Sequence, residues 1–412
     1  MLQSPSDRQA ADARLAPFNS RAGFMAAGLA TVVSIAFISL VVSVSFILTT
    51  GAGVSAMSVD FRVFWGAARL AVAGEPLAAL DPVRLGASHA TYPDAYLPWL
   101  YPPGFLLLVT PLGFMSFATA FLVWTAAAYA AITLAVRPFV AEIRPVWVLL
   151  AVAPAYLPTM LLGQTSLFWM AGLLAALAAL RAERWILAGV LIGCLTLKPQ
   201  LGLMIPFALL GIGAWRTILA AVVTTIVLMA GPTLIYGLEY WSLLQALFVE
   251  HGDRMIYSCQ SVRLMISPVN TLCFYGLASQ SALPIQWGIM ALMMALVLWV
   301  WRSDRAGFDV KVAVLLIAIL LSAPYLWYYE GALMAAIALF LIRGGVLLTR
   351  PGHVVLLFLL WIGSGMQAVN FFYDALHQGW LGAAYIPPLL FICLGLCLLQ
   401  TRATPQAVVP AK

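Results

Sequence analysis

Charged side chains are rare in this sequence, and a few of them stand where they could do chemistry. Only 9% of the 412 residues are Asp, Glu, Lys or Arg. Asp60 and Arg62 follow directly on a long apolar run, Lys198 stands within "TLKPQL", and Glu330 ends "PYLWYYE". A partly buried carboxylate can accept a proton because burial raises its pKa. Lysine and arginine can hold an anion. These groups define a candidate site if the fold brings them together.

The composition is that of a membrane protein. Hydrophobic residues make up 64% of the chain, whereas a soluble domain carries roughly 25% charged residues. The apolar runs have the length of membrane helices, about 15–25 residues, and not the ~10-residue alternating pattern of an outer-membrane barrel. The formal net charge of +6 does not indicate nucleic acid, because the arginines stand singly between apolar runs. We therefore expect an all-α polytopic membrane protein.

About twelve transmembrane helices are expected. The runs assigned to them lie at about 24–48, 116–136, 146–162, 165–180, 185–197, 200–213, 217–236, 285–301, 310–324, 330–343, 353–370 and 383–400. Twelve spans place both termini on one side, together with 15 of the 21 Lys and Arg residues. Because positive charge marks the cytoplasmic side, residues 1–23 and 401–412 are predicted to be cytoplasmic tails, disordered over 1–20 and 401–412. Residues 24–400 are predicted to form a single transmembrane domain.

The opposite side carries the irregular parts of the chain. It has the two long loops, 50–115 and 237–284, and the breaks "GQTS", "LKPQ", "PYLWYYE" and "NFFYDALHQGW". Polar groups that are costly in a membrane thus converge on the extracytoplasmic face, which predicts a cleft there. Within the first loop, residues 61–72 suit a helix along the interface, and 101–114 a re-entrant or interfacial helix.

Several motifs in a fixed order give a resemblance to a known family. They are "DFRVFWGAARLAVAGEPLAALDP", "YPPGFLLLVTPLGFMSFATAFLVW", "GQTSLFWMAGLLAAL", "AGVLIGCLTLKPQLGLMIPFALL", "CQSVRLM" and "PYLWYYEGALMAAIALF". This series, over about 50–345, resembles the family 87 glycosyltransferases. These membrane enzymes have the GT-C fold, a helical bundle, and are similar to the bacterial polyprenyl-phosphate-mannose-dependent α-mannosyltransferases.

The resemblance implies a reaction and its partners. A sugar, with mannose as the expected one, leaves a polyprenyl-phosphate donor and is transferred with inversion to a hydroxyl of a lipid or glycan acceptor. The reaction takes place on the extracytoplasmic face, here of a bacterial inner membrane. Asp60 matches the acidic residue that acts as base early in the first external loop of these enzymes. The alternative to a catalytic role is helix capping, because Asp60 stands at the start of a helix-like stretch.

Three cations are candidates for binding the donor phosphate. A lysine buried in lipid costs ~3 kcal/mol or more, so Lys198 needs an anionic partner, either the donor phosphate or Glu330. Arg62 and Arg263 could clamp phosphate oxygens with their planar guanidinium groups. The alternative for both arginines is a place in solvent or among lipid headgroups.

A second group of residues suits contacts with the sugar or the acceptor. Its members offer polar groups near turns on the same side, or aromatic rings for stacking: Gln164, Gln260, Ser261, Tyr101, Tyr325 and Glu330. Helix capping is an equal alternative for Ser261, and an aromatic belt at the interface is one for the tyrosines. His251 is expected to lie on the surface, since no partners stand at metal-binding spacing.

No metal site or cofactor is expected. The first loop has no pair of carboxylates of the DxD kind, and a protein cation can replace the metal at a lipid-phosphate donor. Cys259 and Cys273 share one polar loop and could pair in an oxidising compartment, but spacing alone cannot supply the geometry.

The sequence also departs from the family and leaves a rival function open. Leu80 stands where the family often has tyrosine before Asp81, and the late motif has Tyr325 after the proline and ends in Glu330, in place of histidine and aspartate. A polytopic transporter or flippase of lipid-linked glycans is the alternative function. Such a protein would place its site at the bilayer midplane between repeated halves, and no repeat is seen in this chain.

Overall fold

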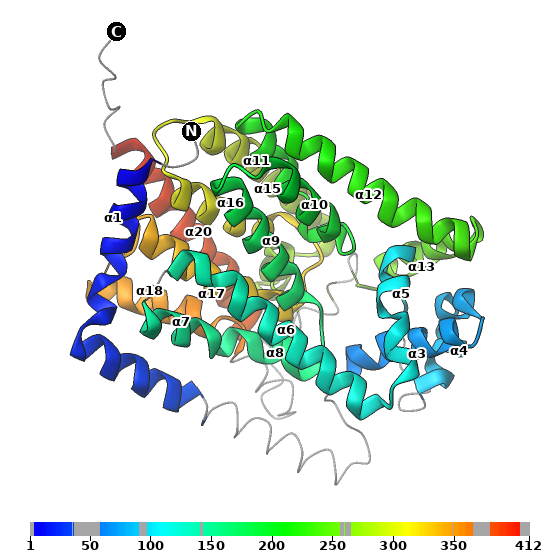
Figure 1. Ribbon diagram of the computed structural model, residues 1–412. Helices are drawn as coiled ribbons and strands as arrows, with labels where there is room; N and C mark the ends of the chain where they lie inside the picture. Colours follow the sequence, from blue (N-terminus) through cyan, green and yellow to red (C-terminus); the bar gives the residue numbers. More distant parts are fainter. Residues whose placement is uncertain are drawn as a thin grey trace.

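The computed structural model describes residues 4–34, 36, 58–89, 97–140, 143–255, 259, 265–348, 350–365 and 380–403 (Figure 1). In these ranges the chain is mostly helical, and its one β-type pairing there is an isolated antiparallel bridge between Met265 and Trp327. The predicted all-α class is confirmed.

Five helical segments in the described ranges are long and apolar enough to cross a membrane, by length and composition. They are α6 (Phe117–Val140), the segment Arg144–Leu162, α12 (Trp215–Tyr236), α15 (Ser279–Arg302) and residues Ala384–Arg402 of α20 (Trp380–Ala403). All five overlap runs that were predicted as spans. The chain is thus an integral membrane protein, and the count of twelve spans stays a prediction.

Shorter helices occupy other predicted runs. They are Arg21–Ser34, α9 (Ser166–Arg181), α10 (Trp185–Leu195), α11 (Ile205–Gly211), α16 (Phe308–Ser322), α17 (Leu333–Arg343) and α18 (Pro351–Ile362). Prolines account for two of the breaks between helices. Lys198 leaves the helical region, with φ −134° and ψ 76°, directly before Pro199, because a residue that precedes proline avoids the helical region. The segment Arg144–Leu162 is likewise divided into α7 (Arg144–Ala151), η4 (Pro154–Tyr156) and α8 (Leu157–Leu162).

The centre of the helical body is formed by α16 and α17. Every residue of α16 is buried, and so is nearly all of α17. A helix that is apolar on all sides must be enclosed by others, and α16 packs against α15, α17 and α20. The two central helices matter for the site because the segment that joins them contains Tyr325 and Glu330.

Helices of the first loop form a second packed group at one end of the molecule (Figure 1). The group consists of α3 (Val59–Val72), η2 (Pro76–Leu80), α4 (Pro82–His89), α5 (Pro103–Val109) and η3 (Thr110–Phe114). Buried aromatic rings hold it together, with Phe64 edge-on to Trp99 and to Phe105. The predicted helices over 61–72 and 101–114 are therefore present, and their position at the membrane interface stays a prediction. Next to them lies α13 (Glu239–Met255).

The expectation of a disordered N-terminal tail is wrong. Residues Pro5–Leu15 form α1, which Ser4 and Asp7 begin with a capping box, and Leu15 is fully buried. A 3-10 turn, η1 (Ala16–Asn19), follows. Contacts with the buried Arg343 hold this helix against the protein. Arg343 Nη1 lies 3.1 Å from Asp12 Oδ1, and Arg14 Nη1 donates to the Arg343 carbonyl over 2.5 Å.

Candidate active site

The first turn of α3 is attached to the end of α8, and this places Asp60. The Ser58 amide donates to the Leu161 carbonyl over 2.6 Å. Gly163 ends α8 with a φ of +72°, and a Cβ on it would lie 2.5 Å from Cβ of Phe61. Only glycine combines that backbone conformation with so close an approach. Asp60 therefore lies directly beside the "GQTS" turn.

Gln164 joins Asp60 to the other polar groups. Its Nε2 donates to Asp60 Oδ2 over 2.9 Å. Its Oε1 accepts from the Thr165 amide at 3.1 Å, and both the Tyr101 hydroxyl and Lys198 Nζ lie 3.4 Å from the same atom. Because donors surround Oε1, the amide must turn its Nε2 toward the carboxylate.

Lys198 and Glu330 form a buried ion pair. Lys198 Nζ lies 2.5 Å from Glu330 Oε1, and the Ser166 hydroxyl donates to Glu330 Oε2 over 2.8 Å. Lys198 is 4% exposed and Glu330 2%. Water therefore solvates neither charge, and each is stabilised by the other. The Lys198 ammonium also lies 5.0 Å from the centre of the Tyr329 ring. The cluster of Asp60, Gln164, Lys198, Glu330 and Ser166 is called the polar cluster below.

Burial gives Asp60 the pKa of a weak base near neutrality. Loss of water around the carboxylate raises its pKa from 3.8 to about 6. The hydrogen bond from Gln164 and the charge of Lys198 lower the pKa, and the charge of Glu330 raises it. A carboxylate with this pKa is ionised at pH 7 and still has appreciable affinity for a proton.

Three aromatic residues form a wall next to the polar cluster. Tyr325 and Trp327 precede the 3-10 turn η7 (Tyr328–Ala332), which contains Tyr329. Trp327 stacks on Tyr329 with ring centres 6.2 Å apart, and Tyr325 packs edge-on to Trp327 at 6.1 Å. The Tyr325 hydroxyl lies 2.6 Å from Nε2 of His251 in α13. His251 is buried, so the expectation that it lies on the surface is wrong. It is instead placed to support Tyr325.

Tyr101 is positioned from its backbone. The Tyr240 hydroxyl donates to the Tyr101 carbonyl over 2.9 Å and accepts from Trp99 Nε1 at 2.6 Å. The Tyr101 ring packs edge-on to Phe64 with centres 5.3 Å apart. These contacts direct its hydroxyl at Gln164.

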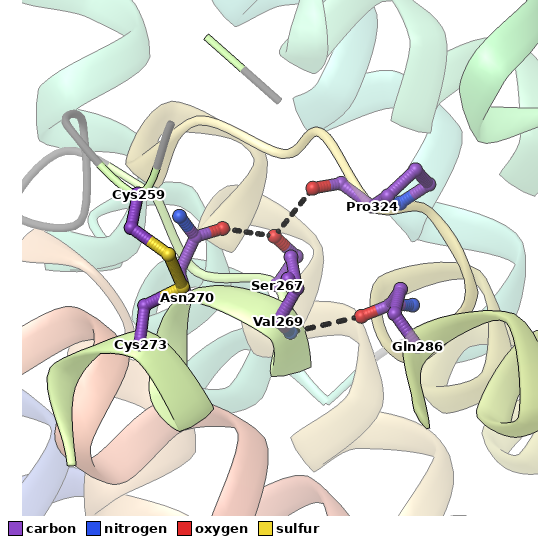
Figure 2. The surroundings of a disulfide bond; sticks show 7 residues. All are labelled: Cys259, Ser267, Val269, Asn270, Cys273, Gln286 and Pro324. Carbon is purple, nitrogen blue, oxygen red and sulfur yellow. Dashed lines mark hydrogen bonds between the residues drawn. A yellow bond between two sulfur atoms is a disulfide. The ribbon is translucent and has the colours of Figure 1, made fainter. Parts of the chain in front are cut away.

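A disulfide closes part of the second long loop, and hydrogen bonds join the loop to α15 and to the chain that carries the wall; Figure 2 shows the disulfide and the bonds of Ser267 and Val269. Cys259 and Cys273, the latter in α14 (Pro268–Phe274), form a disulfide with Cα atoms 5.9 Å apart. The Ser267 hydroxyl donates to the Pro324 carbonyl over 2.9 Å, and Gln286 Oε1 accepts from the Val269 amide at 2.9 Å. The Ile266 amide donates to the Leu326 carbonyl, also over 2.9 Å. The backbone that carries Tyr325 and Trp327 is thereby held in place.

The residues nominated from the sequence fall into three groups. Asp60, Tyr101, Gln164, Lys198 and Glu330 come together, with Tyr325 on the adjoining wall. The Arg62 guanidinium lies instead over the Phe117 ring, 4.4 Å from its centre. Gln260, Ser261 and Arg263 lie outside the described residues.

Sequence reasoning missed Ser166, Thr165 and Tyr329. Ser166 lies within the "GQTS" motif, and as a hydroxyl in an apolar context it would need a buried partner. The Thr165 hydroxyl is buried and accepts or donates no hydrogen bond among the described residues. Tyr329 could have been found from the alternation of Tyr325 and Trp327.

The described residues contain no group of three or more His, Cys, Asp or Glu side chains that could hold a metal ion. Independence of metal ions stays a prediction.

Comparison with known proteins gives one finding. Residues 99–324, more than half of the chain, match the profile of glycosyltransferase family 87. No curated protein and no solved structure matched the chain. The matched range includes Tyr101, Gln164 and Lys198. It begins after Asp60 and ends before Tyr325 and Glu330.

Proposed function

This chain belongs to glycosyltransferase family 87, and on that premise we propose that it moves a sugar from a polyprenyl-phosphate carrier to a hydroxyl of a lipid or glycan. Mannose is the first sugar to test. The reaction inverts the anomeric centre and takes place on the extracytoplasmic face of a bacterial inner membrane.

The observation that carries this proposal is the link between a carboxylate and a cation through one amide. Gln164 contacts Asp60 with Nε2 and approaches Lys198 with Oε1, over 2.9 and 3.4 Å. Inverting transfer needs a base on one side of the anomeric carbon and charge stabilisation for the leaving phosphate on the other. Asp60 and Lys198 supply these two functions within the span of one glutamine side chain.

The proposed step is a single displacement. The acceptor oxygen attacks the anomeric carbon and gives its proton to Asp60. The bond from that carbon to the phosphate oxygen breaks, its electron pair stays on the phosphate, and the polyprenyl phosphate leaves. Lys198 stabilises the charge that grows on the phosphate. Glu330 keeps Lys198 in place before the donor binds, and the Ser166 hydroxyl holds Glu330.

The other nominated residues fit recognition of the sugar or the acceptor. Tyr101, Gln164 and Glu330 present oxygen or nitrogen atoms to sugar hydroxyls, and Tyr325 with its wall offers rings on which a pyranose or the lipid can stack. Gln260 and Ser261 are proposed as further sugar contacts, with Arg62 and Arg263 as further contacts to the donor phosphate.

The proposed side of the membrane rests on two supports. Disulfides persist in oxidising compartments outside the cytoplasm, and the Cys259–Cys273 disulfide lies beside the aromatic wall. Positive charge is concentrated in the loops predicted for the opposite side.

The direct test is product formation by the purified protein. It is incubated in nanodiscs with radiolabelled polyprenyl-phosphate mannose, or another polyprenyl-phosphate sugar, and with bacterial membrane lipid. A labelled product is expected from the wild type and not from Asp60→Asn. If every donor binds but none yields a glycoside, the transport function replaces this proposal.

A further inference from the structure

A pocket at the far ends of the two central helices lies away from the polar cluster. Its volume is about 180 Å³, and it is lined by residues of α1, α16, α17 and α20 and of the turn before α16. The 15 residues of α16 separate the pocket at Phe308 from the chain that leads to Tyr325, which is roughly 20 Å at 1.5 Å per residue. The pocket is thus not part of the proposed glycosyl-transfer site.

Three arginines line this pocket. They are Arg14, Arg305 and Arg343. Arg343 is only 1% exposed, and it gives Nε to Asp309 over 2.9 Å and Nη1 to Asp12 over 3.1 Å. Its Nη2 is buried and has no hydrogen-bond partner among the described residues. A buried guanidinium nitrogen without an acceptor is costly, and the side chain that carries it lines the pocket.

The N-terminus of α16 adds amide donors to the same pocket. Gly307 is the N-cap, no side chain caps the helix, and residues Gly307–Val310 line the pocket. The first amides of a helix have no partner within it and carry partial positive charge. An uncapped helix start beside arginine side chains is a favourable place for an oxyanion.

The acidic residues of the pocket are already engaged. Asp309 accepts from Arg343, and Asp7 accepts from the Ser4 amide in the capping box of α1. Arg14 and Arg305 form no ion pair with any residue that the structure describes. The lining has three arginines against the two carboxylates of Asp7 and Asp309, so its formal charge is positive. The volume exceeds the ~10–15 Å³ that one water needs by the same measure.

We propose that this pocket binds a phosphate group through Arg14, Arg305, Nη2 of Arg343 and the amides at the start of α16. Guanidinium groups match the geometry of phosphate oxygens. The pocket belongs to the side that the distribution of Lys and Arg assigns to the cytoplasm. The phosphate is therefore either the headgroup of an anionic phospholipid in that leaflet or part of a soluble phosphate compound.

The test measures binding in two arms with the full-length protein. In one, inorganic phosphate is titrated by calorimetry in phosphate-free detergent buffer, with chloride at equal ionic strength as reference. In the other, protein from nanodiscs of phosphatidylglycerol is analysed by native mass spectrometry for retained lipid, with a phosphate-free galactolipid as reference. Saturable binding in the first arm identifies a soluble source, and retention of phosphatidylglycerol identifies the headgroup.

Two matched variants decide whether the pocket is responsible. Arg305→Ala removes an exposed pocket arginine, and Arg302→Ala removes an exposed arginine three residues earlier that does not line the pocket. We expect Arg305→Ala to weaken binding by about tenfold or more, the scale of one charge-assisted contact, and Arg305→Glu to weaken it further. Arg302→Ala should bind like the wild type. Absence of saturable binding in both arms, or equal loss in Arg302→Ala and Arg305→Ala, overturns the proposal.

Discussion

A single amide separates the proposed base from the proposed phosphate-binding cation. Gln164 Nε2 donates a hydrogen bond to Asp60, and Gln164 Oε1 accepts from Lys198, Tyr101 and the Thr165 amide. The sequence could nominate Asp60, Gln164, Lys198 and Glu330 because each is polar in an apolar context. It could not exclude Arg62, since two residues along a helix correspond to a turn of about 200°. In the structure this rotation directs the Arg62 side chain away from Asp60 and over the Phe117 ring.

Replacing Asp60 by asparagine should abolish transfer without unfolding the protein. Asparagine keeps the shape and can still contact Gln164, but it cannot accept the proton, so we expect a loss of ~10²-fold or more. Donor binding should be retained, as measured by retention of labelled donor on the purified variant. Near-normal turnover by Asp60→Asn would remove Asp60 as base and make Glu330 the next carboxylate to test.

The pH dependence of transfer should follow the same carboxylate. A base works in its ionised form, so kcat/KM should rise as pH increases through about 6, the pKa to which burial raises Asp60. Gln164→Leu removes a hydrogen bond that lowers this pKa and should displace the rising limb to higher pH. A limb that stays in place in Gln164→Leu would assign it to another group.

Lys198→Met tests the cation against a purely structural role. Loss of the ammonium should reduce transfer by about 10²-fold, the scale for one group that stabilises transition-state charge. The single variant also leaves Glu330 buried without its partner, which destabilises the fold. The double variant Lys198→Met with Glu330→Gln removes both charges and should fold but remain inactive. Recovery of transfer in the double variant would assign Lys198 to the ion pair alone.

At the scale of elements, one glycine determines how α3 meets α8. Gly163→Ala places a methyl group 2.5 Å from Cβ of Phe61 and forces alanine to a φ of +72°. Gly74→Ala is a matched control with a φ of +84° and no heavy atom within 4 Å of the new Cβ. The backbone penalty, about 1–2 kcal/mol, is common to both. We expect Gly163→Ala to lose thermal stability and transfer well beyond Gly74→Ala, and equal losses would contradict the packing argument.

The disulfide should matter through the segment it fastens. Replacing Cys259 and Cys273 by serine releases a 14-residue separation, which is worth about 3 kcal/mol in the chain-entropy estimate. The contacts of Ser267 with Pro324 and of Ile266 with Leu326 should weaken, and transfer should fall with them. Cys194→Ser, at a free cysteine, serves as control. Unchanged transfer and unchanged thermal unfolding in the double serine variant would contradict a positioning role.

Helix positions were the most predictable part of the fold, and the short elements the least. The apolar runs predicted α6, α12 and α15 to within a few residues of one or both ends. A long helix that is surrounded by lipid or protein needs a long run of apolar residues, and such a run is visible in the sequence. In contrast, α1 has a polar sequence. Its order depends on Arg343, which lies 331 residues from Asp12, and no local pattern reports such a pairing. The burial of His251 against Tyr325 was missed for the same reason.

At the scale of the whole molecule, orientation in the membrane is the main prediction. Both termini should be cytoplasmic, and residues 50–115 and 237–284 external. An alkaline phosphatase fusion at Gly252 should be active and one at Ala182 inactive, because alkaline phosphatase matures only outside the cytoplasm. Activity at Ala182 and none at Gly252 would reverse the orientation and, with it, the proposed side of the reaction.

The contact between α1 and Arg343 also has a consequence for biogenesis. Ribosomes add roughly 5–20 residues per second, so Asp12 emerges roughly 15–65 s before the arginine that it pairs with, 331 residues later. During that time α1 lacks Arg343, and the contact of Arg8 with the Arg181 carbonyl in α9 is available much earlier. A nascent chain that stops short of α17 therefore carries α1 without its ion pair to Arg343, and the final docking of this helix waits for α17.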